Sequence, residues 1–185
     1  RHDLLASHAV KLFEHMLGRG GNQPPQILVR NVHPDQSFAN HCMYMASVVL
    51  ESWRSAIAEE DKPLSVLTAS FGPAVRLHLL DAYGWQLLAC NRVTSTPTKP
   101  PHRAADVPQQ ANGIAQSPEV SEMAMLERSG WLADLQREIP PGLTPKAASG
   151  FIAVSSNVFD FDTARHCFAE LESLMARVAD AIDES

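Results

Sequence analysis

DTARHCFAELESLMARVADAIDES, residues 162–185, is the stretch that decides how the rest of this chain must fold. Its apolar residues recur at alternating steps of four and three, which is the spacing of one face of an amphipathic helix. They are Ala164, Phe168, Leu171, Met175, Val178 and Ile182. Asp162 suits the N-cap position, with the apolar Phe161 before it. Burial of this stripe would contribute on the order of 10 kcal/mol, so the helix needs a surface to lie on.

That surface is either the rest of the chain or a second copy of the helix. Both arrangements demand the same spacing, so the pattern alone leaves the two open. Our primary prediction is self-association through this helix. The predicted interface then consists of the large residues of the stripe, which are Phe168, Leu171, Met175, Val178 and Ile182.

The composition indicates one soluble domain. The chain has 185 residues, of which 45% are hydrophobic, and this is enough for a single domain over residues 1–185 with a real core. Its net charge is −6, whereas domains that bind phosphate backbones are usually basic, so nucleic acid is not an expected partner. No apolar run reaches the roughly 18 residues of a membrane-spanning helix. Three widely spaced cysteines predict free thiols and a cytoplasmic location, with a single disulfide as the alternative.

The first part of the chain reads as helices joined by short strands. Residues 3–17 carry a helical stripe, and a second helix begins at Asp35 or Ser37 with apolar residues on more than one side. Residues 26–32 and 64–71 are short runs rich in β-branched and other apolar residues, and they predict strands.

Residues 73–93 admit two interpretations. Ala74–Leu80 alternates between apolar and polar residues, which favours a strand, and Trp85–Val93 would be its hairpin partner. The rival is a helix that begins with Pro73 and runs to Leu88. Gly84 would then lie inside the helix at a cost of about 1 kcal/mol. The hairpin is our primary prediction.

The second part of the chain begins with a proline-rich segment, residues 94–118. Its five prolines exclude a continuous helix or a central strand, so we expect an exposed loop that could also serve as a binding arm. Residues 119–138 predict a helix interrupted at Gly130, and residues 149–161 predict a strand that leads into the closing helix. The strands gather between helices, which predicts an α+β fold: a small antiparallel sheet flanked by helices, with a mostly α fold as the alternative.

Two His-Cys dipeptides are the only hints of chemistry. Thiolate and imidazole are the ligands that zinc prefers, so His41, Cys42 and Cys90 are candidate metal ligands. Adjacent helical residues point about 100° apart, however, and no CxxC pair is present, so we expect neither a metal nor a cofactor. Cys167, near the start of the closing helix, is a candidate nucleophile with His166 or another histidine as its base. No GxSxG, Walker A or dinucleotide-binding pattern occurs.

Three hypotheses of function follow. The first is a regulatory or adaptor domain, not an enzyme, that acts through contacts with a protein partner or with itself. The second is a small-molecule sensor whose pocket lies between sheet and helices. The third is a Cys/His-dependent enzyme or a metal-binding protein. The residues that would line the sensor's pocket are Met45, Phe71, Trp85 and Phe151.

Overall fold

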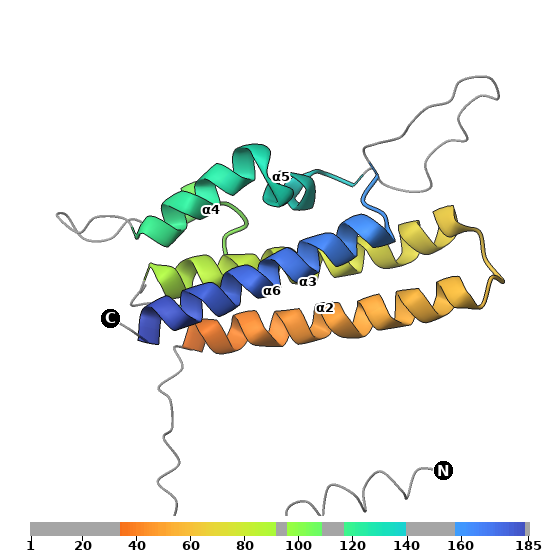
Figure 1. The fold of residues 1–185 in the computed structure, drawn as a ribbon, viewed down its shortest axis with the longest axis horizontal. Coiled ribbons are helices and arrows are strands. Elements are labelled where there is room, and N and C mark those ends of the chain that lie inside the picture. Colours follow the sequence, from red (N-terminus) through yellow and green to blue (C-terminus); the bar gives the residue numbers. More distant parts are fainter. Residues whose placement is uncertain (1–33, 92–95, 109–116, 140–157, 184–185) are drawn as a thin grey trace, which may run out of the picture. The chain divides into compact units, whose positions relative to one another are not determined.

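The computed structural model describes residues 34–91, 96–108, 117–139 and 158–183 (Figure 1). By its internal contacts the chain divides into two units, Arg1–Asn31 and Val32–Ser185, and every described residue belongs to the second. The account below is of that unit alone. The helix predicted at residues 3–17 and the strand predicted at 26–32 lie outside the described residues.

The described residues form helices and connecting segments, with no strand among them. The fold is therefore all-α, and the prediction of an α+β fold with a small antiparallel sheet was wrong; the mostly α alternative describes the structure. The elements are α2 (Pro34–Ala58), α3 (Leu64–Cys90), the short 3-10 helix η1 (Ala104–Asp106), α4 (Pro118–Ser129), α5 (Trp131–Gln136) and α6 (Phe161–Asp183).

Helix α3 takes the place of three predicted strands. It is 27 residues long and passes without a break through the runs that were expected to be a strand and a hairpin. Every residue from Ala82 to Ala89 is buried, Gln86 included, so this half of the helix is enclosed on all sides and shows no helical period in the sequence. Pro73 lies inside α3 on its exposed side, where water can replace the backbone hydrogen bond that proline cannot make.

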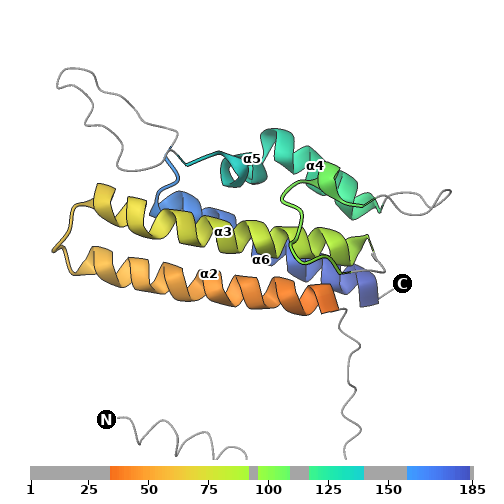
Figure 2. The same cartoon turned by 180° about the vertical axis from the view of Figure 1, so that it is seen from behind.

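Three long helices form the body of the unit. Helices α2, α3 and α6 run side by side, and α4, α5 and η1 cover α3 and α6 on the side away from α2 (Figures 1 and 2). Among the described elements, helix α2 is therefore an outer layer, with its helical neighbours on one side. Its buried side faces the bundle and consists of Asp35, Ala39, Met43, Ala46, Leu50 and Trp53.

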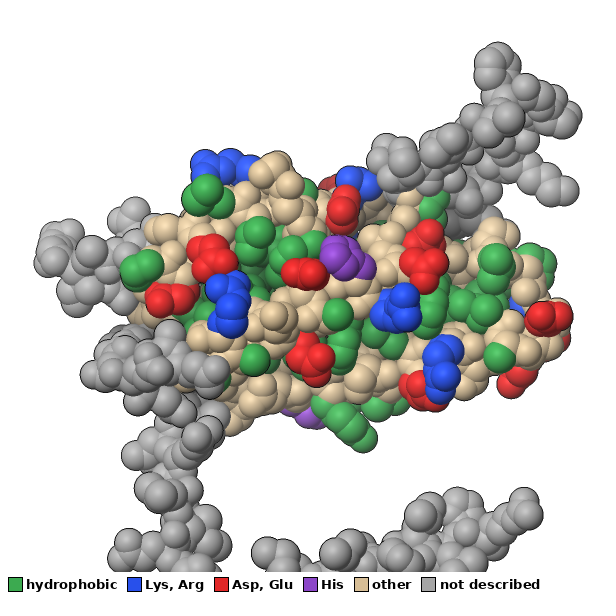
Figure 3. Space-filling view, viewed as in Figure 1, with side chains coloured by type: hydrophobic (Ala, Val, Ile, Leu, Met, Phe, Trp, Pro, Cys, Tyr) green, Lys and Arg blue, Asp and Glu red, His purple; other side chains and the backbone are tan. Residues whose placement is uncertain are grey.

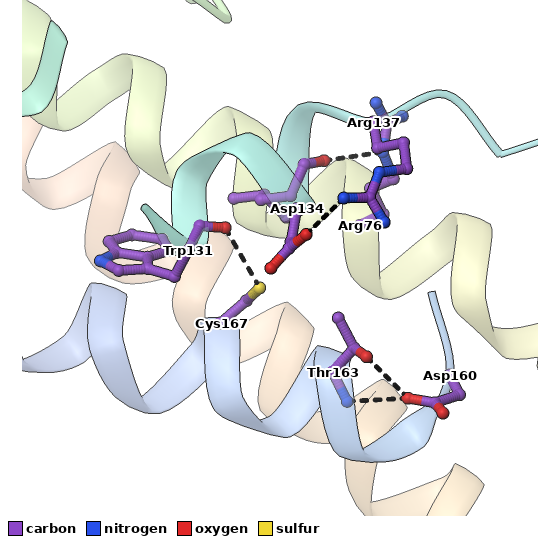
Figure 4. A network of polar contacts seen from close by, with 8 residues as sticks. Arg76, Trp131, Asp134, Arg137, Asp160, Thr163 and Cys167 are labelled. Atoms are coloured by element: carbon purple, nitrogen blue, oxygen red, sulfur yellow. Dashed lines mark hydrogen bonds and ion pairs between the residues drawn. The ribbon is translucent and has the colours of Figure 1, made fainter. Parts of the chain in front are cut away.

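Helix α6 begins earlier than predicted, because its capping residue is Asp160 and not Asp162. The Oδ1 atom of Asp160 accepts hydrogen bonds from the backbone N–H of Thr163, at 2.9 Å, and from its hydroxyl, at 2.8 Å (Figure 4). This carboxylate satisfies an N–H group that the first turn of the helix leaves without a partner. Residues 158–160 are thus a lead-in to the helix; the rest of the strand predicted at 149–161, residues 149–157, lies outside the described residues.

The described part of the proline-rich segment, residues 96–108, crosses over α3, and we call it the strap. Ala104 and Val107 of the strap are buried in the core. Side chains of four helices fasten it. The contacts are Thr96 Oγ1 to Asp35 Oδ1 at 3.1 Å, His102 Nε2 to Asp81 Oδ1 at 2.8 Å, Gln136 Nε2 to the His102 carbonyl at 2.8 Å, Ala104 N to Glu127 Oε1 at 2.7 Å, and Asn91 Nδ2 to the Pro108 carbonyl at 3.0 Å.

Candidate functional site

The stripe of α6 that was predicted as an interface faces the interior of the unit. Leu171, Met175 and Val178 are buried, and Phe168 is half-buried against the same core. The side chain of Ile182 lies outside the described residues. An amphipathic stripe packs wherever apolar surface is offered, and here α2, α3 and α5 offer it. A surface for a partner must therefore be sought elsewhere on the unit.

The outward side of α2 carries large apolar side chains in contact with solvent. Phe38 is 46% exposed, Tyr44 65% and Val48 43%. Met45 is half-buried beside them, and His41 is exposed. Together these five residues are called the α2 surface below. Hydrophobic and histidine side chains protrude along the lower edge of Figure 3, over α2.

Two properties of the sequence produce the α2 surface. At 3.6 residues per turn, Val48 stands on the side of the helix opposite to Ala46 and Leu50, which point into the bundle. In addition, none of residues 36–50 is Asp, Glu, Lys or Arg. Solvated helix faces normally carry such charges, so four turns without one, on the exposed side of this helix, make the α2 surface the candidate contact site.

The α2 surface has an aromatic edge and a charged rim. The ring of Phe38 lies against the buried ring of Trp85 of α3, with 4.9 Å between ring centroids, so this edge of the α2 surface is packed on the neighbouring helix. At the far end, Arg54 pairs with Glu51 at 2.6 Å on the solvent side of α2. An apolar centre with polar groups at the margin is the usual anatomy of a protein interface.

The thiol of Cys42 lies where α2 packs against α3. It is half-buried, and burial, followed by the nearby charge of Asp81, raises the pKa of this thiol. Asp81 itself holds His102 of the strap at 2.8 Å. Because the carboxylate favours the protonated thiol, this grouping of cysteine, aspartate and histidine does not activate Cys42 as a nucleophile.

The other two cysteines also stay protonated. Burial raises the pKa of Cys90 and of Cys167 to about 12. Cys167 points into the core, where its Sγ lies 3.7 Å from the carbonyl oxygen of Trp131 (Figure 4). His166, the preceding residue, points about 100° away and is exposed, near Glu170. The structure therefore does not bring the predicted nucleophile and its neighbouring base together.

The predicted metal ligands do not converge. Within the described ranges, no group of three or more His, Cys, Asp or Glu side chains could hold a metal ion. His41 is exposed on α2, Cys42 lies at the seam with α3, and Cys90 is the last residue of α3. Zinc needs three or four protein ligands around one point, and these three residues do not supply them together with any described neighbour.

The residues predicted to line a ligand pocket are also separated. The predicted pocket required a sheet, and the described residues contain no strand. Phe71 packs on Trp53 with centroids 6.0 Å apart, whereas Trp85 packs on Phe38. Phe71 and Trp85 are both in α3, and fourteen residues of helix separate them by about 21 Å. Met45 belongs to the α2 surface, and Phe151 lies outside the described residues.

One buried polar group was missed by sequence reasoning. The hydroxyl of Tyr83 donates to Glu127 Oε1 at 2.6 Å, and the same oxygen accepts from the backbone N–H of Ala104 at 2.7 Å. Burial and this hydrogen bond raise the pKa of Tyr83 well above its usual range. Tyr83 and Glu127 are 44 positions apart, so no local pattern in the sequence connects them. The sequence offers only the two residue types, which is too little to predict the contact.

The described unit is thus an all-α bundle whose candidate site is a surface for contact. A scan of protein-family models, a search of curated proteins and a search of solved structures each found no match to this chain. Among the described helices, none combines the length and the apolar character needed to cross a bilayer.

Proposed function

We propose that this chain is a regulatory or adaptor domain that acts by binding protein, and that the α2 surface is its contact site. The observation that carries the proposal is the outward side of α2, where Phe38, Tyr44 and Val48 are exposed within fifteen residues free of acidic and basic side chains. This revises the site predicted on α6 and keeps the class of function predicted from the sequence.

The size of the apolar contribution supports this choice. Full burial of one large apolar side chain contributes about 1.5–3 kcal/mol, and the three residues are still 46%, 65% and 43% exposed. Completing their burial would therefore contribute about 3 kcal/mol. Aromatic side chains in the middle of a patch are the usual centres of binding energy in interfaces. The proposal includes a reducing compartment, the cytoplasm, because all three cysteines are free thiols.

The two other hypotheses stay predictions. A sensor would be stabilised by its ligand, so a panel of metabolites should raise the melting temperature of the chain if it senses one of them. A Cys/His enzyme would lose its activity on Cys167→Ala. The raised pKa of Cys167 weighs against that chemistry, because the thiolate is the nucleophile.

The proposal is tested with a photo-reactive amino acid. Benzoylphenylalanine is placed at Val48 in one full-length chain and at Met125 of α4 in another, in cells that express the protein. Met125 is the matched control, since it is a large apolar residue that is 62% exposed on another helix. We expect irradiation to give a protein adduct, identified by mass spectrometry, from position 48 and none from position 125. Equal yields at the two positions, or no adduct at 48, would refute the proposal.

A further inference from the structure

We infer that the partner of the α2 surface is a second copy of this chain, with the two α2 helices packed antiparallel about a two-fold axis. The inference rests on the proposed function and names the partner at the same site. Cyclic dimers are the commonest assemblies of soluble proteins, and their interfaces pair one patch with itself. The question is therefore whether the α2 surface suits itself.

The charges of the chain favour self-pairing at this place. Two copies, each with a net charge of −6, repel one another over most of their surfaces. Residues 36–50 contain no Asp, Glu, Lys or Arg, so a contact there neither places like charges together nor removes a charge from water. Recognition of a different protein is usually steered by complementary charges around the contact, and the charged residues at the rim of the α2 surface, Glu51 and Arg54, already neutralise each other.

The exposed charge of Glu51, just beyond this stretch, favours the antiparallel orientation. In a parallel pair, Glu51 of one copy would lie beside Glu51 of the other, which is unfavourable. In an antiparallel pair centred on Met43, the two Glu51 residues lie about 24 Å apart along the axis, beyond the Debye length of about 8–10 Å. The residue level with Glu51 is then Asp35 of the other copy, whose side chain is fully buried on the bundle side of α2 and so faces away from the contact. That centre also places Phe38 of one copy beside Val48 of the other, and His41 beside Met45. In the antiparallel arrangement, each end of the α2 surface therefore packs against the other end of the same surface on the second copy.

The area limits the strength of the dimer. Phe38, Tyr44 and Val48 together expose roughly 300 Å² per copy, and Met45 and His41 extend this. A standard interface covers about 800 Å² per partner. We therefore expect a dimer that dissociates on dilution, with a Kd in the micromolar range or weaker.

Sedimentation velocity of the full chain tests the inference, over concentrations from about 5 to 500 µM. The test variant is Val48→Glu, whose new charge projects into solvent in the monomer and so leaves the fold intact. The control is Met125→Glu, which places the same charge at an exposed apolar position of α4. We expect the wild type and M125E to shift together from monomer to dimer as concentration rises. V48E should need at least about tenfold more protein for the same shift, with an unchanged circular dichroism spectrum.

The relative orientation of the two α2 helices is determined with benzoylphenylalanine at position 48, in a mixture of ¹⁴N- and ¹⁵N-labelled chains. The adduct should join position 48 of one isotope to a peptide around Phe38 of the other, and a join to position 48 itself would overturn the antiparallel arrangement. A wild type that stays monomeric at every concentration would overturn the second-copy inference. The proposed function would then stand only if position 48 captures a different, identified protein. A dimer that V48E does not weaken would overturn the placement on α2.

Discussion

The carbonyl oxygen of Pro101 in the strap lies directly against Gly84 of α3. A β-carbon at Gly84 would stand 2.0 Å from that oxygen and 2.7 Å from the Cβ of Pro100, far inside van der Waals contact. Helix and strap approach this closely only because position 84 has no side chain. The same close approach keeps the strap near enough to the helices for His102 to contact Asp81 and for the N–H of Ala104 to donate to Glu127.

Gly84→Ala should destabilise the unit, although alanine is the better helix former by about 1 kcal/mol. The new methyl group meets backbone atoms, which cannot move aside as a flexible side chain can, so the strap must lift from α3. Overpacking of this kind costs about 1–3 kcal/mol after the gain in helix propensity is included. Urea denaturation followed by circular dichroism measures the change in the free energy of unfolding.

Gly72→Ala is the matched control in the same helix. The nearest atom to a β-carbon there is the carbonyl oxygen of Phe159, at 3.3 Å, which a small adjustment relieves. We expect a change within about 1 kcal/mol in either direction. If G84A is no less stable than G72A, the strap does not rest on α3 in the way described.

Glu127 of α4 is half-buried and should matter to the stability of the unit. Glu127→Ala leaves the hydroxyl of Tyr83 and the N–H of Ala104 without their acceptor, and a buried unsatisfied group costs about 1–3 kcal/mol. Tyr83→Phe removes one donor and leaves the other bond in place, so it should cost about 1 kcal/mol. The free energies of unfolding of both variants and of the double variant give the coupling energy, expected between about 0.5 and 3 kcal/mol. Strict additivity would contradict the contact.

The stability of the unit should fall at alkaline pH. Burial raises the pKa of Cys90 and Cys167 from about 9 to about 12 in the folded chain, and it also raises the pKa of Tyr83. Above about pH 9 the unfolded chain loses protons that the folded chain retains, so the free energy of unfolding decreases as pH rises. Each group that differs by a full proton contributes a slope of about 1.4 kcal/mol per pH unit.

Thermal and urea unfolding between pH 7 and pH 11 measures this slope. We expect constant stability to about pH 8 and a steady loss above pH 9. Replacing Cys90 and Cys167 by Ala should lower stability at neutral pH, through lost packing, and should reduce the slope above pH 9. An identical slope in the double variant would show that these thiols do not titrate as their burial implies.

Local signals in the sequence predicted several helices correctly. The interruption at Gly130 is confirmed, since α4 ends at Ser129 and α5 begins at Trp131. Helix α3 was mistaken for strands because Val75, Leu77 and Leu79 happen to alternate. In the structure Val75 and Leu79, four apart, are buried, while Leu77 is 51% exposed, which is a helical pattern with one apolar residue facing water.

The glycine that counted against a helix shows why such errors arise. The helix propensity of Gly84 can be judged from the sequence alone, and it counts against a helix. The reason that position 84 must be glycine is the close approach of Pro101, a tertiary contact that the sequence does not show. The outward side of α2 was also not decided by local signals in the sequence. Tyr44 and Val48 broaden the apolar face of α2, which predicted burial on more than one side, but the sequence does not state whether the second side meets the chain itself or solvent.

Met175→Lys with Val178→Lys distinguishes a core stripe from an interface stripe on α6. Both residues are buried, at 6% and 3% exposure, so two ammonium groups would have to leave water inside the bundle. Each such substitution removes about 1.5–3 kcal/mol of apolar burial and adds the cost of desolvating a charge, which together exceed the stability of a typical small domain. We expect loss of the helical circular dichroism signal and of cooperative unfolding. The contrasting pair is Arg165→Ala with Arg177→Ala on the exposed side of the same helix, which should change the free energy of unfolding by less than about 1 kcal/mol. A folded, soluble monomer from the double lysine chain would mean that the stripe of α6 faces a partner after all, and the assignment of the contact site to α2 would have to be abandoned.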